Sequence, residues 1–212
     1  LCVDKTGTIT ENTMKVHDVV SLEPNEKEEL PPLKELLGDF AHAMSKDNIT
    51  MAAMQEYFTQ GSGQVATSVT SFSSAFKYSS ATFGTVSYVL GAPEFVLRND
   101  YETYQETIES YGSEGYRVLV FGRYEGTPDG KALTESVIPY GLVLLANPIR
   151  KEAWETFQYF ADQGVDIKVI SGDNPVTVSK VASQAGIANA DNYIDASQLK
   201  TPDDIKRAVL KY

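Results

Sequence analysis

The residues of this chain best suited to chemistry stand near its beginning. Residues 1–3, Leu-Cys-Val, predict the end of a buried strand, and Asp4 follows it directly. In an open α/β sheet, reactive groups lie just beyond the carboxyl ends of the strands, so Asp4 is where a nucleophilic carboxylate would be. A carboxylate can attack phosphorus and store the phosphoryl group as an aspartyl-phosphate. The alternative interpretation is an ordinary turn at a strand end, with a solvated aspartate.

The residues after Asp4 suit phosphoryl transfer. The hydroxyl groups of Thr6 and Thr8 and the backbone N–H groups around Gly7 can donate hydrogen bonds to phosphoryl oxygens. Mg²⁺ prefers oxygen ligands, so the Asp4 carboxylate and the Thr6 carbonyl are the predicted metal ligands. This stretch therefore predicts a loop that holds a phosphoryl group beside magnesium.

A second candidate phosphate site lies at Ser171. Residues 165–170 predict a strand that ends at Ser171, and residues 176–185 predict a helix that begins after Pro175. A hydroxyl group and a helix N-terminus together can hold a phosphate. The apolar run 140–146 predicts another strand, buried on both faces. We expect a helical, right-handed crossover to join it to residues 165–170 in a parallel sheet.

The middle of the chain has the pattern of an antiparallel sheet with helices beside it. Residues 71–83 and 85–90 are rich in alternating, β-branched and aromatic side chains around Gly84, which predicts a hairpin. Residues 23–32 are acidic and contain prolines, so we expect a loop or a short polar helix there. Further strands are expected at 13–20, 115–124 and 194–196. Helices are expected at 33–44, 48–58, 95–97 (behind Pro93), 103–111 and 205–211, and a further one is expected to open at 147–150 and to end at Gly164.

Length and composition narrow the class of protein. A chain of 212 residues with 42% hydrophobic and 22% charged residues is typical of a globular protein with one large domain or two small ones. A formal net charge of −11 argues against a nucleic-acid partner. Cys2 is the single cysteine, so no disulfide can form within the chain. Because the first strand lacks its beginning, we expect the chain to be part of a longer polypeptide.

The run Asp-Lys-Thr-Gly-Thr at residues 4–8 resembles the phosphorylation signature of P-type ATPases, the cation and lipid pumps that form an aspartyl-phosphate. Ser-Gly-Asp-Asn at 171–174 is similar to that family's Thr-Gly-Asp-Asn, and Asn-Pro-Ile-Arg at 147–150 to its Asp-Pro-Leu-Arg. Asn147 departs from the family's aspartate, a change expected to weaken the domain hinge or a nucleotide contact. The resemblance implies a catalytic set of Asp4, Lys5, Thr6, Ser171, Gly172 and Asp173.

The resemblance extends to a nucleotide site in the middle of the chain. Phe72 and Lys77 look like the family's aromatic residue that stacks on adenine and its lysine near the phosphates. Gly-Ala-Pro-Glu at 91–94 resembles the family's Lys-Gly-Ala-Pro-Glu, with Leu90 in place of the lysine, so we expect weak ATP affinity that Leu90→Lys would raise. The alternatives are that Phe72 belongs to the sheet core and that Lys77 is a solvated strand residue. The implied ATP-binding set is Phe72, Lys77, Gly91, Ala92 and Arg117.

The resemblance implies an α/β fold made of two domains. Residues 1–15 and 138–212 would form a truncated phosphorylation domain with a parallel sheet of the haloacid dehalogenase type. Residues 16–137 would form an inserted α+β nucleotide-binding domain with an antiparallel sheet. The implied cofactors are ATP and Mg²⁺, and the implied partners are the remainder of the polypeptide and a transported cation bound in its membrane helices. The implied location is the cytoplasmic side of a cell membrane, which we expect to be bacterial.

Two other classes of protein remain open. One is a phosphatase of the haloacid dehalogenase type with an inserted cap domain. Such phosphatases usually carry a second aspartate two residues after the nucleophile, as general acid and base, and Thr6 cannot do this work. The other is a nucleotide-binding module without catalysis. Since the family's later magnesium-binding motif is absent from these residues, we expect this fragment to bind nucleotide without turning it over.

Overall fold

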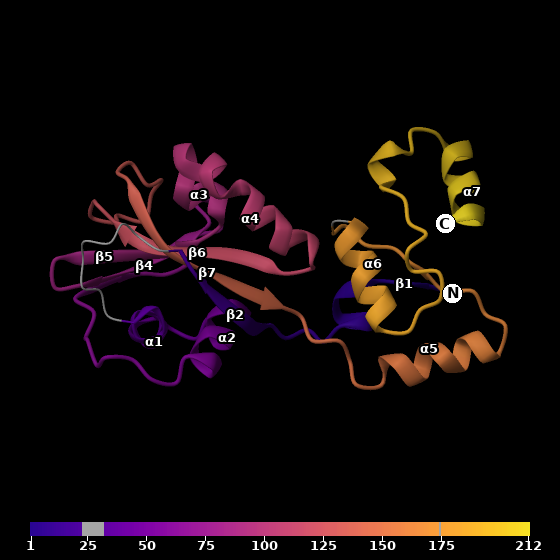
Figure 1. The fold of residues 1–212 in the computed structure, drawn as a ribbon, viewed down its shortest axis with the longest axis horizontal. Coiled ribbons are helices and arrows are strands. Elements are labelled where there is room, and N and C mark those ends of the chain that lie inside the picture. The colour runs from indigo at the N-terminus through magenta and orange to yellow at the C-terminus, as the bar shows by residue number, and fades with distance from the viewer. Residues whose placement is uncertain (23–31, 174) are drawn as a thin grey trace. The chain divides into compact units, whose positions relative to one another are not determined.

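The chain folds into two compact units. The computed structural model describes residues 1–22, 32–173 and 175–212 (Figure 1). The first unit contains Leu1–Thr13, Gly112–Tyr116 and Asn147–Tyr212, and the second contains Met14–Tyr111 and Arg117–Ala146. Most of the acidic segment expected at 23–32, residues 23–31, lies outside the described residues. Within the described residues, no helix is both long enough and apolar enough to cross a bilayer.

The second unit is built on a six-stranded antiparallel sheet. The strand order is β2-β7-β6-β5-β4-β3, and every neighbouring pair is antiparallel. The predicted hairpin is confirmed, with its turn at Gly84. One edge strand, β2, has a register shift between Val16 and Asp18. The strands are β2 (Lys15–Ser21), β3 (Ser68–Thr70), β4 (Tyr78–Phe83), β5 (Val86–Gly91), β6 (Arg117–Tyr124) and β7 (Val137–Ala146).

Helices cover both faces of this sheet. Figure 1 shows α1 (Leu33–Ala43) and α2 (Ile49–Tyr57) on one face, and α3 (Pro93–Leu97) and α4 (Tyr101–Ser113) on the other. A single 3₁₀ turn, Arg98–Asp100, joins α3 to α4. Helix α2 begins where the sequence predicts, because the Asn48 side chain accepts a hydrogen bond from the Met51 N–H at 2.8 Å. Between the sheet and α1, Phe40 and Phe121 pack edge to face with ring centroids 5.4 Å apart.

The strand predicted at 140–146 is present as part of β7, but its expected partner is wrong. β7 pairs antiparallel with β2 and β6, not parallel with the strand that follows. The apolar run misled because α1 and α2 cover one face of this sheet and α3 and α4 the other. Leu142 and Val143 are therefore both fully buried although they point to opposite faces. An apolar run reports burial on both faces, which antiparallel sheets also achieve when both faces are covered.

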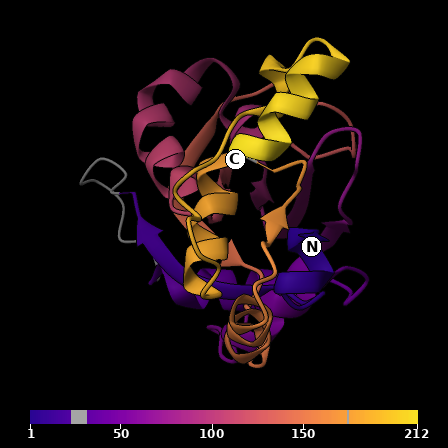
Figure 2. The ribbon, with the colours of Figure 1, turned by 90° about the vertical axis from the view of Figure 1, so that its right-hand side faces the viewer.

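The first unit contains a short parallel sheet and three longer helices (Figure 2). Strand β1 (Cys2–Val3) pairs parallel with β8 (Lys168–Val169), so the parallel sheet expected here is confirmed. The helices are α5 (Ala153–Asp162), α6 (Pro175–Gln184) and α7 (Pro202–Lys211). Ile9 and Phe157 lie in the core of this unit with small residues of α6 and the segment that follows it.

Two local expectations for the first unit are wrong. Leu1 and Cys2 are exposed, because β1 has only β8 beside it in the part of the chain that the structure describes. Residues 194–196 form no strand. The Asp195 carboxylate accepts a hydrogen bond from the Ser197 N–H at 2.9 Å and starts a 3₁₀ turn, Ala196–Gln198. A short polar side chain that binds its own backbone in this way competes with strand pairing.

Candidate functional site

The segment after β1 is a tight loop around Gly7. One wide turn, Lys5–Ile9, is closed by a hydrogen bond from the Thr10 N–H to the Lys5 carbonyl at 3.0 Å. Gly7 has φ +78°, a conformation that other residues rarely adopt. Thr10 is fully buried, and its hydroxyl lies 3.4 Å both from the Lys5 carbonyl, to which it donates, and from the Gly7 N–H, from which it accepts. Sequence reasoning gave Thr10 no role, because nothing in the motif distinguishes a buried hydroxyl from an exposed one.

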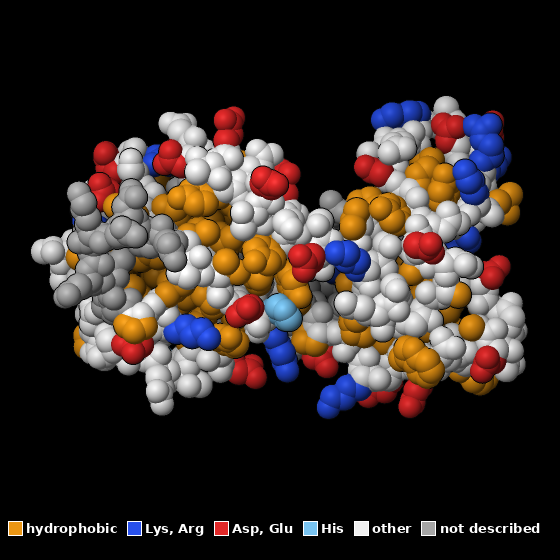
Figure 3. Space-filling model, in the orientation of Figure 1, with side chains coloured by type: hydrophobic (Ala, Val, Ile, Leu, Met, Phe, Trp, Pro, Cys, Tyr) orange, Lys and Arg blue, Asp and Glu red, His pale blue; other side chains and the backbone are white. Residues whose placement is uncertain are grey.

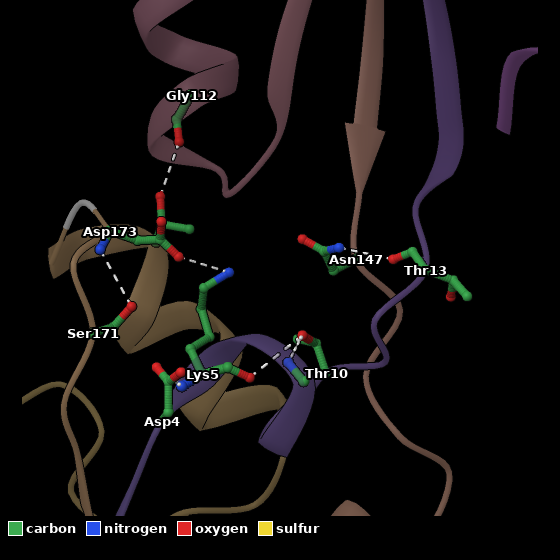
Figure 4. A network of polar contacts seen from close by, with 10 residues as sticks. Asp4, Lys5, Thr10, Thr13, Gly112, Asn147, Ser171 and Asp173 are labelled. Carbon is green, nitrogen blue, oxygen red and sulfur yellow. Dashed lines mark hydrogen bonds and ion pairs between the residues drawn. The ribbon is translucent and has the colours of Figure 1, made fainter. Parts of the chain in front are cut away.

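The loop presents Asp4 to solvent and buries Lys5. The Asp4 carboxylate accepts a hydrogen bond from the Lys5 N–H at 2.7 Å. The Lys5 side chain is only 8% exposed, and its Nζ lies 2.9 Å from a carboxylate oxygen of Asp173 (Figure 4). A buried ammonium group requires such a partner, because an unpaired charge in this setting would be strongly unfavourable. The ion pair therefore joins the two loops that the sequence singled out.

The second loop lies at the carboxyl end of β8. Since β1 and β8 are parallel, with Val3 opposite Val169, the two loops leave the same edge of the sheet. The Ser171 hydroxyl accepts a hydrogen bond from the Asp173 N–H at 3.2 Å, which turns the chain into α6. Gly172 is exposed within this turn, and Asn174 lies outside the described residues.

A short ribbon supports the first loop. We use the name "147–150 ribbon" for residues 9–13 paired with residues 147–150. Its backbone bonds run from the Glu11 N–H to the Pro148 carbonyl (2.8 Å) and from the Arg150 N–H to the Ile9 carbonyl (3.0 Å). At one end the Asn147 side-chain amide donates to the Thr13 carbonyl at 2.7 Å, which an aspartate could not do (Figure 4). Asn147 thus fastens one end of the ribbon.

Few groups in the described residues could bind a metal ion. Across residues 1–22, 32–173 and 175–212 no three His, Cys, Asp or Glu side chains converge into a metal-binding group. Asp4 and Thr6 are both exposed, and Asp173 is already paired with Lys5. The donors available at the loop are oxygen atoms, which fits Mg²⁺, an ion that usually binds one or two carboxylates and keeps several waters.

Four of the five residues expected to bind nucleotide gather at one end of the six-stranded sheet. Tyr78, at the start of β4, pairs with Gly91, the last residue of β5. Gly91 in turn pairs with Val120 of β6, which lies three residues after Arg117. Lys77, Gly91 and Ala92 therefore lie next to one another, and Arg117 lies at the same end of the sheet, where β6 extends three residues past the level of Gly91. The Ala92 N–H donates to the Lys77 carbonyl at 2.9 Å. Lys77 and Arg117 are exposed, and Lys77 has φ +57°.

Phe72 lies in a loop, not in the predicted strand. Residues 71–77 turn back on themselves, with a hydrogen bond from the Lys77 N–H to the Ser73 carbonyl at 2.7 Å, and β4 starts only at Tyr78. The Ser73 hydroxyl accepts from the Phe76 N–H at 3.2 Å, a local bond that competes with strand pairing. Phe72 is 43% exposed, so it is not a residue of the sheet core.

Leu90 lies in the core, only 2% exposed, opposite Phe121 of β6.

Tyr78 follows the turn formed by residues 71–77. Burial is the main cause that raises the pKa of Tyr78, and the charge of Asp129 raises it further. The Tyr78 hydroxyl donates to the Lys131 carbonyl at 2.6 Å and holds the long connection between β6 and β7. On the face seen in Figure 3, basic side chains are interspersed with acidic ones.

Comparison with known proteins identifies the family. A family model described as haloacid dehalogenase-like hydrolase matches residues 1–211. The chain is 38% identical over 188 residues to the "Calcium-transporting ATPase CtpE" of Mycolicibacterium smegmatis, which covers 88% of this chain and 23% of the relative. It is 36% identical over 203 residues to the "Probable cation-transporting ATPase exp7" of Streptococcus pneumoniae, which covers 94% of this chain and 25% of the relative.

Solved structures match the fold. The crystal structure of a zinc-transporting PIB-type ATPase superposes with a TM-score of 0.61 and 18% identity, over 88% of this chain and 27% of that one. The chain thus spans about a quarter of the length of these relatives. The predicted fold class, a haloacid dehalogenase-like α/β fold with a parallel sheet and an antiparallel sheet, is confirmed. The chain belongs to the haloacid dehalogenase-like hydrolase family and, within it, is a relative of the P-type cation-transporting ATPases.

Proposed function

We propose that this chain is the catalytic part of an ATP-driven cation pump. The first unit acts as the phosphorylation domain and the second as the nucleotide-binding domain. The single observation that carries the proposal is the ion pair between Lys5 and Asp173, 2.9 Å long. It joins two loops at the carboxyl ends of parallel strands, beside an exposed Asp4, in a member of a hydrolase family.

The reaction proposed is transfer of the γ-phosphoryl group of ATP to Asp4. A carboxylate oxygen of Asp4 forms a bond to the γ-phosphorus while the bond from that phosphorus to the β–γ bridging oxygen breaks. ADP leaves with the electron pair of the broken bond, and the product is an acyl phosphate on Asp4. Asp4 suits this role because its carboxylate is exposed and the adjacent Lys5 N–H already fixes one of its oxygens at 2.7 Å.

The residues around Asp4 each have a proposed part in this step. The Lys5 ammonium group and the N–H groups around Gly7 stabilise negative charge on the phosphoryl oxygens. Asp4 and the Thr6 carbonyl would hold Mg²⁺, which would neutralise part of the charge of the phosphates. Thr6 has no carboxylate with which to activate water, so the phosphoenzyme persists as an energy store.

ATP is proposed to bind at the end of the sheet in the second unit. The Phe72 ring is 43% exposed and can stack on a purine. Lys77 and Arg117 are exposed cations at the end of the sheet where Gly91 lies, and they suit the phosphates. Leu90 contributes apolar core under this region and no charge.

The wider role is part of the same proposal. Relatives named as calcium-transporting and cation-transporting ATPases support a transported cation, bound by parts of a longer polypeptide. These two units would then lie on the cytoplasmic side of a membrane, where ATP is available.

The test is phosphorylation of the longer protein that would contain this chain. Incubation with Mg²⁺ and γ-labelled ATP should give an acid-stable label that hydroxylamine removes, and Asp4→Asn should abolish it. The 212-residue chain alone should bind ADP but remain unlabelled, because one carboxylate at this loop leaves the phosphate charge poorly neutralised. Label that survives Asp4→Asn, or ATP hydrolysis without any label, would reject the proposal.

A further inference from the structure

Arg150 makes a side-chain contact that the proposed reaction does not use. It is the last residue of the 147–150 ribbon, and its side chain reaches across to the first loop. The guanidinium Nη2 donates a hydrogen bond to the Gly7 carbonyl at 2.7 Å, and the Arg150 N–H donates to the Ile9 carbonyl at 3.0 Å. Two bonds from one residue thus reach the loop that carries Asp4.

The Gly7 carbonyl is a sensitive point of that loop. A peptide unit is planar and trans, so the Gly7 carbonyl and the Thr8 N–H point in opposite directions from one rigid plane. Gly7 has φ +78° and no side chain, so little else restrains the rotation of this plane. A donor that holds the carbonyl therefore also sets the direction of the Thr8 N–H.

We propose that Arg150 is a positioning residue for phosphoryl transfer to Asp4: it holds the Gly7 carbonyl and so aims the Thr8 N–H at a phosphoryl oxygen. The inference rests on the proposed function, in which N–H groups around Gly7 stabilise the transferred group. The Arg150 guanidinium is charged at every working pH and is a stronger donor than a neutral group. The side chain is exposed and reaches the loop through this bond, so its loss affects positioning more than folding.

The experiment compares Arg150→Ala and Arg150→Lys with the adjacent, exposed Lys151→Ala as the matched control. The longer protein is mixed rapidly with Mg²⁺ and γ-labelled ATP, and the rate of label incorporation is followed at increasing ATP concentration. Because a misplaced group of this kind costs rate and not nucleotide binding, Arg150→Ala should lower the maximal rate about tenfold or more. The half-saturating ATP concentration should stay within about twofold, since the nucleotide contacts lie in the second unit. Arg150→Lys, which keeps a donor, should recover part of the rate, and Lys151→Ala should match the wild type.

An unchanged maximal rate in Arg150→Ala, or a change confined to the half-saturating concentration, overturns the inference while the proposed function stands. Absence of label in the wild type, or label in Asp4→Asn, overturns both. Folding is checked on the 212-residue chain through its single tryptophan, Trp154, which lies in the first unit. If Arg150→Ala shifts the unfolding midpoint, the comparison of Arg150→Lys with the wild type decides, and a full loss of rate there contradicts the role as donor.

Discussion

The substitution Gly91→Ala tests whether the end of the sheet is built as described. A Cβ atom at Gly91 would lie 2.4 Å from the Lys77 carbonyl oxygen and 2.6 Å from the Tyr78 Cβ. Ordinary contact begins at 3.4 Å, so β4 and β5 would have to separate by 3.4 − 2.4 = 1.0 Å at this point. The Lys77 oxygen belongs to the backbone and the Tyr78 Cβ is bonded directly to it, so neither atom can rotate away.

The expected cost follows from two terms. Overpacking a well-packed site costs about 1–3 kcal/mol. Separation of the strands also stretches the 2.9 Å hydrogen bond from the Ala92 N–H to the Lys77 carbonyl, worth about 1 kcal/mol. The free energy of unfolding of the second unit should therefore fall by about 2–4 kcal/mol. The control is Gly112→Ala near the end of α4, a residue of the first unit, where a Cβ would meet no atom within 4 Å and a helix gains from alanine.

The assay is urea unfolding of the 212-residue chain followed by two signals. Far-UV circular dichroism reports both units, while fluorescence of the single tryptophan reports the first unit. Gly91→Ala should lower the urea midpoint of the second unit by about 1–2 M, given a typical dependence of about 2 kcal/mol per molar urea. The tryptophan transition should not move. Equal midpoints for Gly91→Ala and the wild type would refute the close contact on which the reasoning depends.

Three further predictions concern the nucleotide site and α7. Phe72→Ala should weaken ADP binding about tenfold in titration calorimetry, since stacking on one base is worth about 1–3 kcal/mol, and equal affinities would remove Phe72 from the site. Leu90→Lys should not raise nucleotide affinity, against the expectation from sequence. Because Leu90 is only 2% exposed, Leu90→Lys should instead lower the free energy of unfolding by about 3 kcal/mol, and the control Leu90→Met should lower it by less than about 1.5 kcal/mol. Hydrogen bonds from Thr201 and Arg207 lower the pKa of Asp204 to about 2. The bond by which the Asp204 carboxylate caps the start of α7 is therefore present above about pH 4 and is lost as pH falls through 2. Hydrogen exchange of the α7 amides at about pH 5 and about pH 2.5 checks this, and equal protection at the two pH values would contradict it.

The sequence was informative wherever short-range chemistry decides the structure. The loops that follow β1 and β8 were predicted because small, acidic and hydroxyl residues after an apolar run end a strand in few other ways. The start of α2 near residue 48 and the hairpin at Gly84 were predicted for the same reason. Each of these features depends on residues within about four positions of one another.

The errors arose where distant parts of the chain decide. The partner of β7 depends on which helices cover which face, and an apolar run is the same in a parallel and an antiparallel sheet. The inward direction of Leu90 follows from its register with Phe121, which no local pattern near Leu90 reveals. The support that Arg150 gives to the first loop depends on the 147–150 ribbon, whose two segments are more than 130 residues apart in sequence.

The edges of the six-stranded sheet bear on how the fragment behaves at high concentration. A long, flat, exposed edge strand is a template for intermolecular β-pairing and aggregation. Here one edge is β3, only three residues long, and the other is β2, interrupted by its register shift. Beside that irregularity the exposed Lys15 and Asp18 place charges that a second chain would have to desolvate. Neither edge offers an incoming strand a continuous ladder of hydrogen bonds, so this sheet should resist edge-to-edge pairing at the concentrations that calorimetry requires.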